Sequence, residues 1–164
     1  MEEHKNIQAN HNFLLNQYKE TGVYPINHNY LFEQFSDHKE IFEQIEKLIK
    51  NCDYTLGKSV DEFERKICEL TGSRFAVGVG SGTDALFLSL IASGIQKGDE
   101  VITTPYTFYA TIGAIVTAGA KPVFVDIRDD YNINTDLIEK AITDRTKAIM
   151  PVHWSGLGCE MAPI

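Results

Sequence analysis

The feature that most constrains the fold of this sequence is a regular alternation of short apolar strands with helices from Arg74 onward. Strands are expected at 74–79, 100–103, 121–125 and 147–152, and helices at 83–93, 108–118 and 134–142. Strands that alternate with helices in this way are typical of a parallel sheet with right-handed helical crossovers. The sequence therefore predicts an α/β domain with a mainly parallel sheet.

The expected helices carry signals for where they end and what they bury. Gly94, Gly98 and Gly119 fall near helix ends, where glycine commonly serves as the C-terminal cap. The segment 85–92 is apolar almost all round, so we expect this helix to be buried against the sheet.

The part of the chain before the first expected strand has a different character. Residues 3–20 predict a weakly amphipathic helix within a lead-in segment over 1–36. Asp37 to Glu40 and Ser59 to Glu62 both match the capping box, so a helix is expected to start at each. The expected organisation is the lead-in segment followed by a domain over 37–164.

Charge and composition exclude several function classes. The 15 basic and 23 acidic residues give a net charge of −8, which argues against an electrostatic nucleic-acid binder. The N-terminal stretch is polar rather than signal-like, and no apolar run is long enough to span a bilayer. Three widely spaced cysteines favour reduced thiols and a cytoplasmic location. Cys159 and His153 form no recognised metal-ligand spacing, so no metal site is expected.

A glycine-rich turn joins the first expected strand to the next helix, from Val79 to Leu86. Such a turn can bind an anion, because the first amide groups of the helix are unsatisfied and its dipole is positive there. Thr83 can add a hydroxyl, and Thr83 or Asp84 can cap the helix. The turn is neither a Walker loop nor a dinucleotide fingerprint. A capped helix without a ligand explains the same residues, so both interpretations stay open.

Several ordered motifs resemble one known family. The matching stretches are Leu56-Gly57, Phe63-Glu64, Gly80 to Leu86, Gly98 to Ile102, Pro105 to Thr111, Gly119 to Asp126, Ile142-Thr143, Thr146 to Ile149 and Pro151 to His153. In these residues the chain resembles the front part of the DegT/DnrJ/EryC1/StrS sugar aminotransferases, which are fold-type-I pyridoxal-phosphate enzymes. The resemblance runs from about residue 31 to residue 164 and implies part of their large domain, which resembles that of aspartate aminotransferase.

The resemblance implies a pyridoxal 5′-phosphate site made of Gly82, Thr83, Asp84, Phe108 and His153. Gly82 and Thr83 would hold the phosphate, and Phe108 would stack on the pyridine ring. Without the resemblance, Phe108 would be read as a core aromatic residue. His153 is either near the active site or a structural hydrogen-bonding residue, and Asp126 is expected to be a turn residue.

The family also needs a lysine that forms the Schiff base and an acidic residue that pairs with the pyridinium nitrogen. The resemblance places both beyond residue 164. Lys97, Lys121, Lys140 and Lys147 do not match the lysine motif, so no catalytic residue is assigned. We therefore expect an incomplete domain, a fragment or split gene product, that is inactive alone.

The function implied for the intact enzyme is transfer of an amino group to a nucleotide-linked keto sugar, with glutamate as the expected donor. Its products would serve surface polysaccharide or amino-sugar biosynthesis, and it would be a homodimer that binds neither nucleic acid nor membrane. The alternatives are a sugar dehydratase of the same family, a non-catalytic interaction fragment and a gene remnant.

Overall fold

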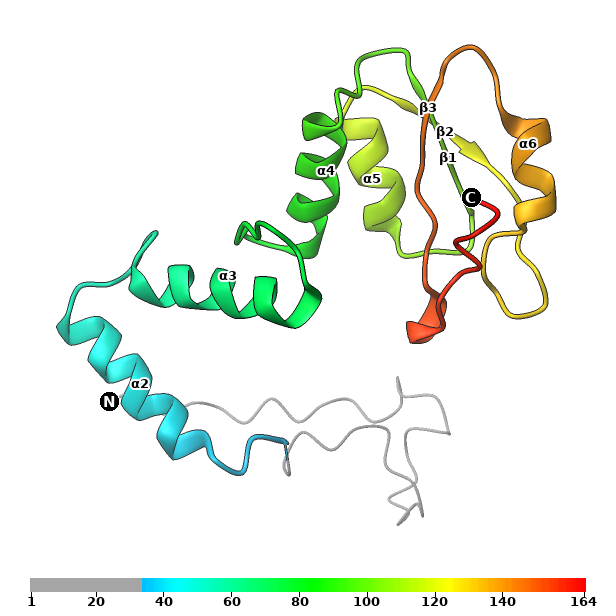
Figure 1. The fold of residues 1–164 in the computed structure, drawn as a ribbon. Helices are drawn as coiled ribbons and strands as arrows, with labels where there is room; N and C mark the ends of the chain where they lie inside the picture. The colour runs from blue at the N-terminus through cyan, green and yellow to red at the C-terminus, as the bar shows by residue number, and fades with distance from the viewer. Residues whose placement is uncertain (1–33) are drawn as a thin grey trace, which may run out of the picture. The chain divides into compact units, whose positions relative to one another are not determined.

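The computed structural model describes residues 34–164, and the chain divides into two units between Lys58 and Ser59 (Figure 1). The helix expected at 3–20 and most of the lead-in segment lie outside the described residues. The first unit contains α2 (His38–Lys50). Asp37 is the N-cap residue of α2, as expected, but its side chain makes no capping hydrogen bond, and its carbonyl accepts from Glu40 N–H at 2.9 Å instead.

The second unit begins with α3 (Lys58–Thr71). This helix starts one residue before Ser59, so the second expected capping box lies inside the helix rather than ahead of it. Glu64, on α3, accepts a hydrogen bond from the backbone N–H of Gly78 at 2.6 Å. That bond ties α3 to the segment that leads into the next helix.

The sheet contains β1 (Glu100–Thr103), β2 (Lys121–Phe124) and β3 (Thr146–Ile149), in the order β2-β1-β3. All pairings are parallel, as predicted, and Ile102 lies opposite Val123 on one side and Ile149 on the other. The central strand β1 is buried along its whole length. These strands agree with the predicted ranges to within a few residues.

The strand expected at 74–79 is not formed. Within the described residues this segment has no strand partner, and the side chains of Phe75 and Val77 are 75% and 79% exposed. Both sides of β1 are already occupied by β2 and β3, so the segment cannot join the sheet beside the central strand. The apolar pattern of this segment predicts a strand, but it does not identify a neighbouring strand with which the segment could pair.

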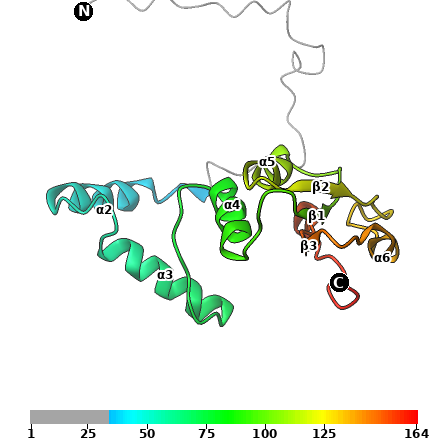
Figure 2. The same ribbon diagram turned by 90° about the horizontal axis from the view of Figure 1, so that it is seen from above.

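The helices after α3 cover the two faces of the sheet. They are α4 (Gly82–Ala92), α5 (Tyr109–Thr117), the 3₁₀ turn η3 (Thr135–Leu137) with α6 (Ile138–Ala141), and η4 (Trp154–Gly156). Figures 1 and 2 show α4 and α5 on one side of the sheet and α6 on the other. Val101 accordingly packs with Leu90 and Ile115, whereas the next residue, Ile102, packs with Ile138.

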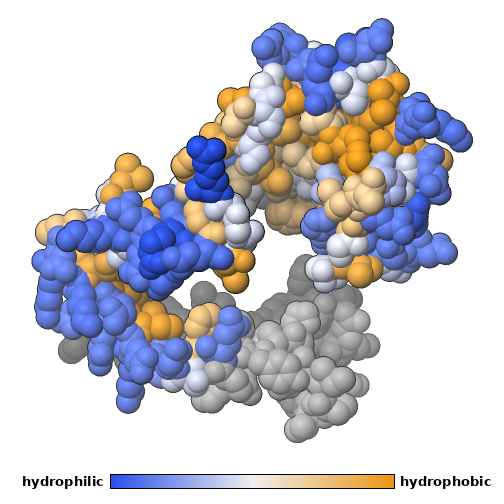
Figure 3. All heavy atoms as spheres, viewed as in Figure 1, coloured by the Kyte–Doolittle hydropathy of each residue, from blue (hydrophilic) through white to orange (hydrophobic). Residues whose placement is uncertain are grey.

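The expected burial of α4 against the sheet is found on one face of the helix only, where Leu90 packs in the same cluster as Val101 of β1. Leu90 is buried, but Leu88 and Ile91 are each 46% exposed. This helix packs against α5 rather than between two layers, so only one of its faces is covered. Figure 3 shows hydrophobic side chains at the surface of the unit that contains the sheet.

The helix ends agree better with the sequence. Gly94 and Gly119 each directly follow the C-cap residue of a helix, α4 and α5 respectively. Both glycines have φ of 82°, the left-handed conformation expected of a glycine that ends a helix. Gly98, with φ of 95°, lies in the turn before β1 instead. Within residues 34–164, no helix is long and apolar enough to cross a membrane.

Candidate functional site

A hollow of about 500 Å³ lies beside the starts of α4 and α5. It is lined from three places in the chain: the start of α4, the loop into α5, and the loop after β3. The lining residues are Gly82, Thr83, Leu86, Thr107, Phe108, Ala110, Thr111, Val152, His153, Trp154 and Ser155. The carboxyl ends of parallel strands meet at one edge of a sheet, which is where α/β folds commonly bind ligands.

The first turn of α4 is held by Ser81 rather than by Thr83 or Asp84. Ser81 is extended, with φ −162° and ψ 167°, and its hydroxyl oxygen accepts from Asp84 N–H at 3.1 Å. The same hydroxyl is 2.9 Å from the Asp84 carboxylate and donates to it. A Cβ at Gly80 would lie 2.9 Å from that carboxylate, so glycine lets the turn close. Asp84 does not line the hollow.

Gly82 and Thr83 begin α4 and both line the hollow. Their backbone N–H groups have no acceptor within the described residues, whereas Asp84 N–H is used by the cap and Ala85 N–H bonds Ser81. A Cβ at Gly82 would meet nothing within 4 Å, so the space beside this backbone is open. Two free donors at the positive end of an 11-residue helix suit an anion such as a phosphate.

Phe108 precedes α5 and lies in the extended conformation, with φ −71° and ψ 144°. Its side chain is 62% exposed and lines the hollow, so it is not a core aromatic residue. Its ring packs against Tyr109, with centroids 4.4 Å apart, which leaves the rest of the ring accessible. The hollow thus combines a helix end that carries two free N–H donors with an open aromatic ring.

A pair of threonine hydroxyls also lines the hollow. Thr107 and Thr111 lie one helical turn apart, and their Oγ1 atoms are 2.8 Å from each other. We did not single them out from the sequence. Their spacing of four residues at a helix start is the signal that could have found them.

The loop after β3 brings His153 to the hollow. Its Nδ1 accepts a hydrogen bond from the backbone N–H of Cys159 at 3.0 Å. A neutral imidazole whose Nδ1 accepts carries its hydrogen on Nε2, so His153 is left with a donor there. The loop turns sharply at Ser155 and Gly156, which have φ of 49° and 85°.

Other residues considered from the sequence lie away from the hollow. Asp126 is a turn residue, as expected, because its side chain accepts from Ile127 N–H at 2.8 Å. Lys121 bonds Glu100 at the start of β1, the end of the strand opposite to the hollow, and Lys97 lies beside Gly119. No lysine is among the described residues that line the hollow.

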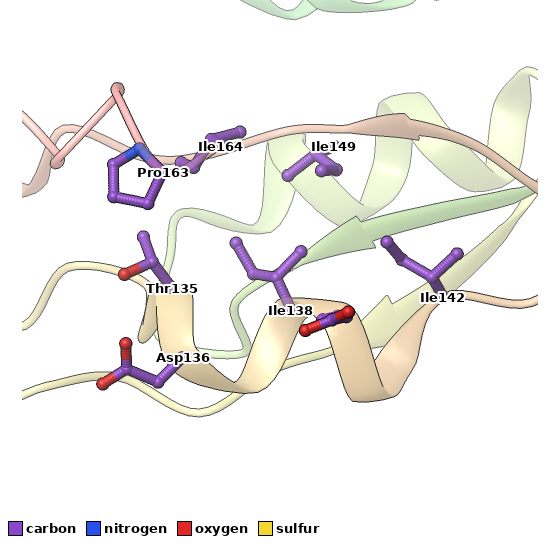
Figure 4. Close-up of a pocket in the computed structure, with 8 residues that line it drawn as sticks. Thr135, Asp136, Ile138, Ile142, Ile149, Pro163 and Ile164 are labelled. Atoms are coloured by element: carbon purple, nitrogen blue, oxygen red, sulfur yellow. The ribbon is translucent and has the colours of Figure 1, made fainter.

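A second hollow of about 420 Å³ lies beside α6 (Figure 4). Ile138 and Ile142 face Ile149 and Ile164 across it, and Asp136 lies at its margin. Its lining residues include carboxylates but no basic side chain. An anionic ligand would be repelled there, so the hollow at α4 is the better candidate site.

The sequence matches the model of the DegT/DnrJ/EryC1/StrS aminotransferase family over residues 36–164. It is 41% identical over 137 residues to dTDP-3-amino-3,4,6-trideoxy-alpha-D-glucose transaminase of Micromonospora megalomicea, which covers 83% of this chain and 37% of the relative.

Solved structures show the same likeness. A DegT DnrJ EryC1 StrS aminotransferase from Brucella abortus has a TM-score of 0.78 at 33% identity, over 84% of this chain and 39% of its own. NtdA from Bacillus subtilis with bound cofactor PMP has a TM-score of 0.77 at 34% identity, over 79% and 30%. The chain shares the fold of these proteins over the aligned part, and it spans about a third of the length of the curated relatives it matches.

Proposed function

The chain belongs to the DegT/DnrJ/EryC1/StrS aminotransferase family, and we propose that it supplies the cofactor-phosphate site of a pyridoxal-phosphate-dependent nucleotide-sugar aminotransferase. One observation carries the proposal: the free amides of Gly82 and Thr83 and the exposed ring of Phe108 line the same hollow. A phosphate and a flat pyridine ring on one molecule are the complement of these groups.

Bound pyridoxal phosphate would supply an electron-accepting ring for the exchange of an amino group. In our proposal Gly82 and Thr83 bind its phosphate through backbone N–H groups and the Thr83 hydroxyl. Phe108 covers one face of the ring, and His153 donates a hydrogen bond into the site from Nε2. Asp84 contributes through the helix cap, since it lies outside the hollow and bonds Ser81.

We also propose that this stretch of chain does not transaminate by itself. The reaction needs a lysine that forms a Schiff base with the cofactor. The absence of lysine from the described lining of the hollow supports this proposal, as does the place of Lys121 at the far end of β1.

The substrate and the assembly are inferred from the relatives. The Micromonospora relative is named for a dTDP-linked amino sugar, so we propose a nucleotide-linked keto sugar as the acceptor of the amino group. We further propose glutamate as the donor, a homodimer as the assembly of the whole enzyme and the cytoplasm as its location.

The cofactor site can be tested by binding alone. Isothermal titration calorimetry would compare pyridoxamine 5′-phosphate with pyridoxamine, which lacks the phosphate, for the chain and for Thr83→Ala and Phe108→Leu. A hydrogen bond to a charged group contributes about 1.5–3 kcal/mol. We therefore expect Thr83→Ala to weaken the phosphorylated ligand by roughly tenfold or more and to leave pyridoxamine unchanged.

Phe108→Leu should lower the affinity for both ligands by a similar, several-fold factor, because stacking contributes about 1 kcal/mol whether or not the phosphate is present. Thr117→Ala, which removes an exposed hydroxyl at the last residue of α5, away from the hollow, serves as the control. Equal affinity of the unsubstituted chain for the two ligands would contradict the proposed phosphate site.

A further inference from the structure

The side chain of Asn132 is buried, with 2% of the residue exposed, and it faces the loop that carries His153. Its Oδ1 accepts from Trp154 N–H at 3.1 Å and from the Cys159 thiol at 3.5 Å. Its Nδ2 donates to the carbonyls of Leu157 and Gly158, at 3.3 and 3.4 Å. One amide therefore bonds to both ends and the middle of the loop 154–159.

Asn132 is itself held in place. Its backbone N–H donates to the Asp130 carboxylate at 3.0 Å, and its carbonyl accepts from Arg128 N–H at 2.9 Å. A second bond, from Nδ2 to Asp130, is 3.3 Å long. The amide is thus presented from a fixed turn, and a buried polar group that keeps its partners favours a single arrangement of them.

The loop that Asn132 holds forms one wall of the candidate site. Trp154 follows His153 directly, and both line the hollow with Thr83 and Phe108. The Cys159 thiol that bonds Asn132 belongs to the residue whose N–H holds His153 Nδ1. The single S–H hydrogen is shared between Asn132 Oδ1 and the Val152 carbonyl, which is the nearer acceptor at 3.1 Å and lies just before His153. Displacement of Cys159 would therefore release the imidazole.

We propose that Asn132 is a positioning residue, whose buried amide holds the loop 154–159 so that His153 and Trp154 face the cofactor site. This inference rests on the proposed function, since pyridoxamine 5′-phosphate is the ligand whose binding reports it. Among residues 34–164, Asn132 makes no hydrogen bond to the start of α4, so it acts through the loop.

The test compares Asn132→Ala and Asn132→Asp with Asn134→Ala in the full 164-residue chain. Asn132→Asp keeps an acceptor for Trp154 N–H but cannot donate to Leu157 and Gly158. Asn134 is the matched control, because it lies on the same turn, caps η3 through Asp136 N–H and has no bond to the loop.

Two readouts separate positioning from mere stability. Calorimetry gives the affinity for pyridoxamine 5′-phosphate, and the emission of Trp154, the only tryptophan of the chain, reports the loop without ligand. We expect both Asn132 variants to shift the emission and to weaken binding at least tenfold at a temperature where they are folded. Asn134→Ala should lower Tm alone.

The outcomes are distinct. Unchanged emission and unchanged affinity in a folded Asn132 variant overturn the inference and leave the proposed function intact. Failure of the unsubstituted chain to bind pyridoxamine 5′-phosphate overturns the proposed cofactor site. In that case the role of Asn132 is decided without ligand, by the shift of the Trp154 emission and by the hydrogen-exchange rate of Trp154 N–H. If Asn132→Ala does not fold, Asn132→Asp decides on the same readouts. If neither folds while Asn134→Ala does, Asn132 is a folding residue and the inference is overturned.

Discussion

The backbone N–H of Gly78 donates to the Glu64 carboxylate across 2.6 Å, and this bond joins α3 to the chain two residues before the Gly80 turn. A Cβ at Gly78 would lie 3.4 Å from the same carboxylate oxygen. The segment 75–81 has no strand partner among the described residues, and the Glu64 bond ties it to α3 just before the Ser81 cap of α4.

Glu64→Ala should loosen this segment and weaken ligand binding at α4. A hydrogen bond to a charged group contributes about 1.5–3 kcal/mol, and this one lies outside the hollow, so we expect only part of it to appear as a several-fold loss of affinity for pyridoxamine 5′-phosphate. Hydrogen exchange at the Gly78 amide, measured by NMR, should accelerate in parallel. Glu69→Ala, which removes an exposed carboxylate from the same helix, is the control. Equal exchange at Gly78 in both variants would contradict this role.

The sheet could be predicted closely because its strands are short apolar runs bounded by turns and helices. Glu100 to Thr103 was predicted in full, and the parallel pairing followed from the alternation with helices. The family resemblance was confirmed by the match over residues 36–164. The roles of Gly82, Thr83, Phe108 and His153 stay predictions, although these residues do line one hollow.

The sequence did not predict which segments pair as strands, or which of several polar side chains makes a given local hydrogen bond. The segment 74–79 has a strand-like composition, but pairing depends on a partner that composition does not identify. Ser81, Thr83 and Asp84 can all cap a helix, and only the backbone geometry selects Ser81. Asn132 was overlooked because a single asparagine before an expected helix is typical of a turn.

The Ser81 cap leads to a second prediction. Ser81→Ala removes the acceptor for Asp84 N–H and should lower the free energy of unfolding by about 1 kcal/mol. Thermal unfolding followed by circular dichroism measures the change. Ser89→Ala, on the same helix away from its first turn, should have a much smaller effect. Alanine has the higher helix propensity, so a loss as large in Ser89→Ala would show that removing any serine hydroxyl from α4 is costly and that the cap is not the cause.

Glu100 lies at the start of β1 with its side chain 2% exposed. Thr143 donates to its carboxylate at 2.7 Å and Arg145 at 2.8 Å, and Lys121 approaches to 3.4 Å. The hydrogen bond from Thr143, followed by that from Arg145, lowers the pKa of Glu100 from 4.5 to about 2. The unfolded chain therefore binds a proton more readily than the folded chain between these values.

This difference in proton binding predicts how the free energy of unfolding falls at acid pH. The contribution of Glu100 is fully present above pH 4.5 and is lost as the pH falls towards 2. Glu100→Gln should lower Tm at pH 7 and flatten the dependence of Tm on pH in that window. Glu139→Gln, which replaces an exposed carboxylate on α6, should leave the slope as it is. An unchanged slope in Glu100→Gln would show that other carboxylates dominate acid unfolding.

Replacing either of two glycines near α5 by alanine should change stability, in opposite directions for the two positions. Gly119 follows the helix with φ of 82°, and a Cβ there would lie 3.3 Å from the backbone Cα of Lys97. Gly119→Ala combines left-handed strain with this contact, so we expect a loss of about 1–2 kcal/mol in the free energy of unfolding.

Gly113 lies inside α5, where an added Cβ meets nothing within 4 Å outside the helix's own backbone. Gly113→Ala should therefore stabilise the fold by about 0.5–1 kcal/mol, because alanine loses less backbone entropy in a helix. Urea unfolding of both variants, with m-values compared, checks that the native state is unchanged. Destabilisation by Gly113→Ala would mean that α5 packs more closely there than its surroundings indicate, and tolerance of Gly119→Ala would mean that the turn before β2 relaxes.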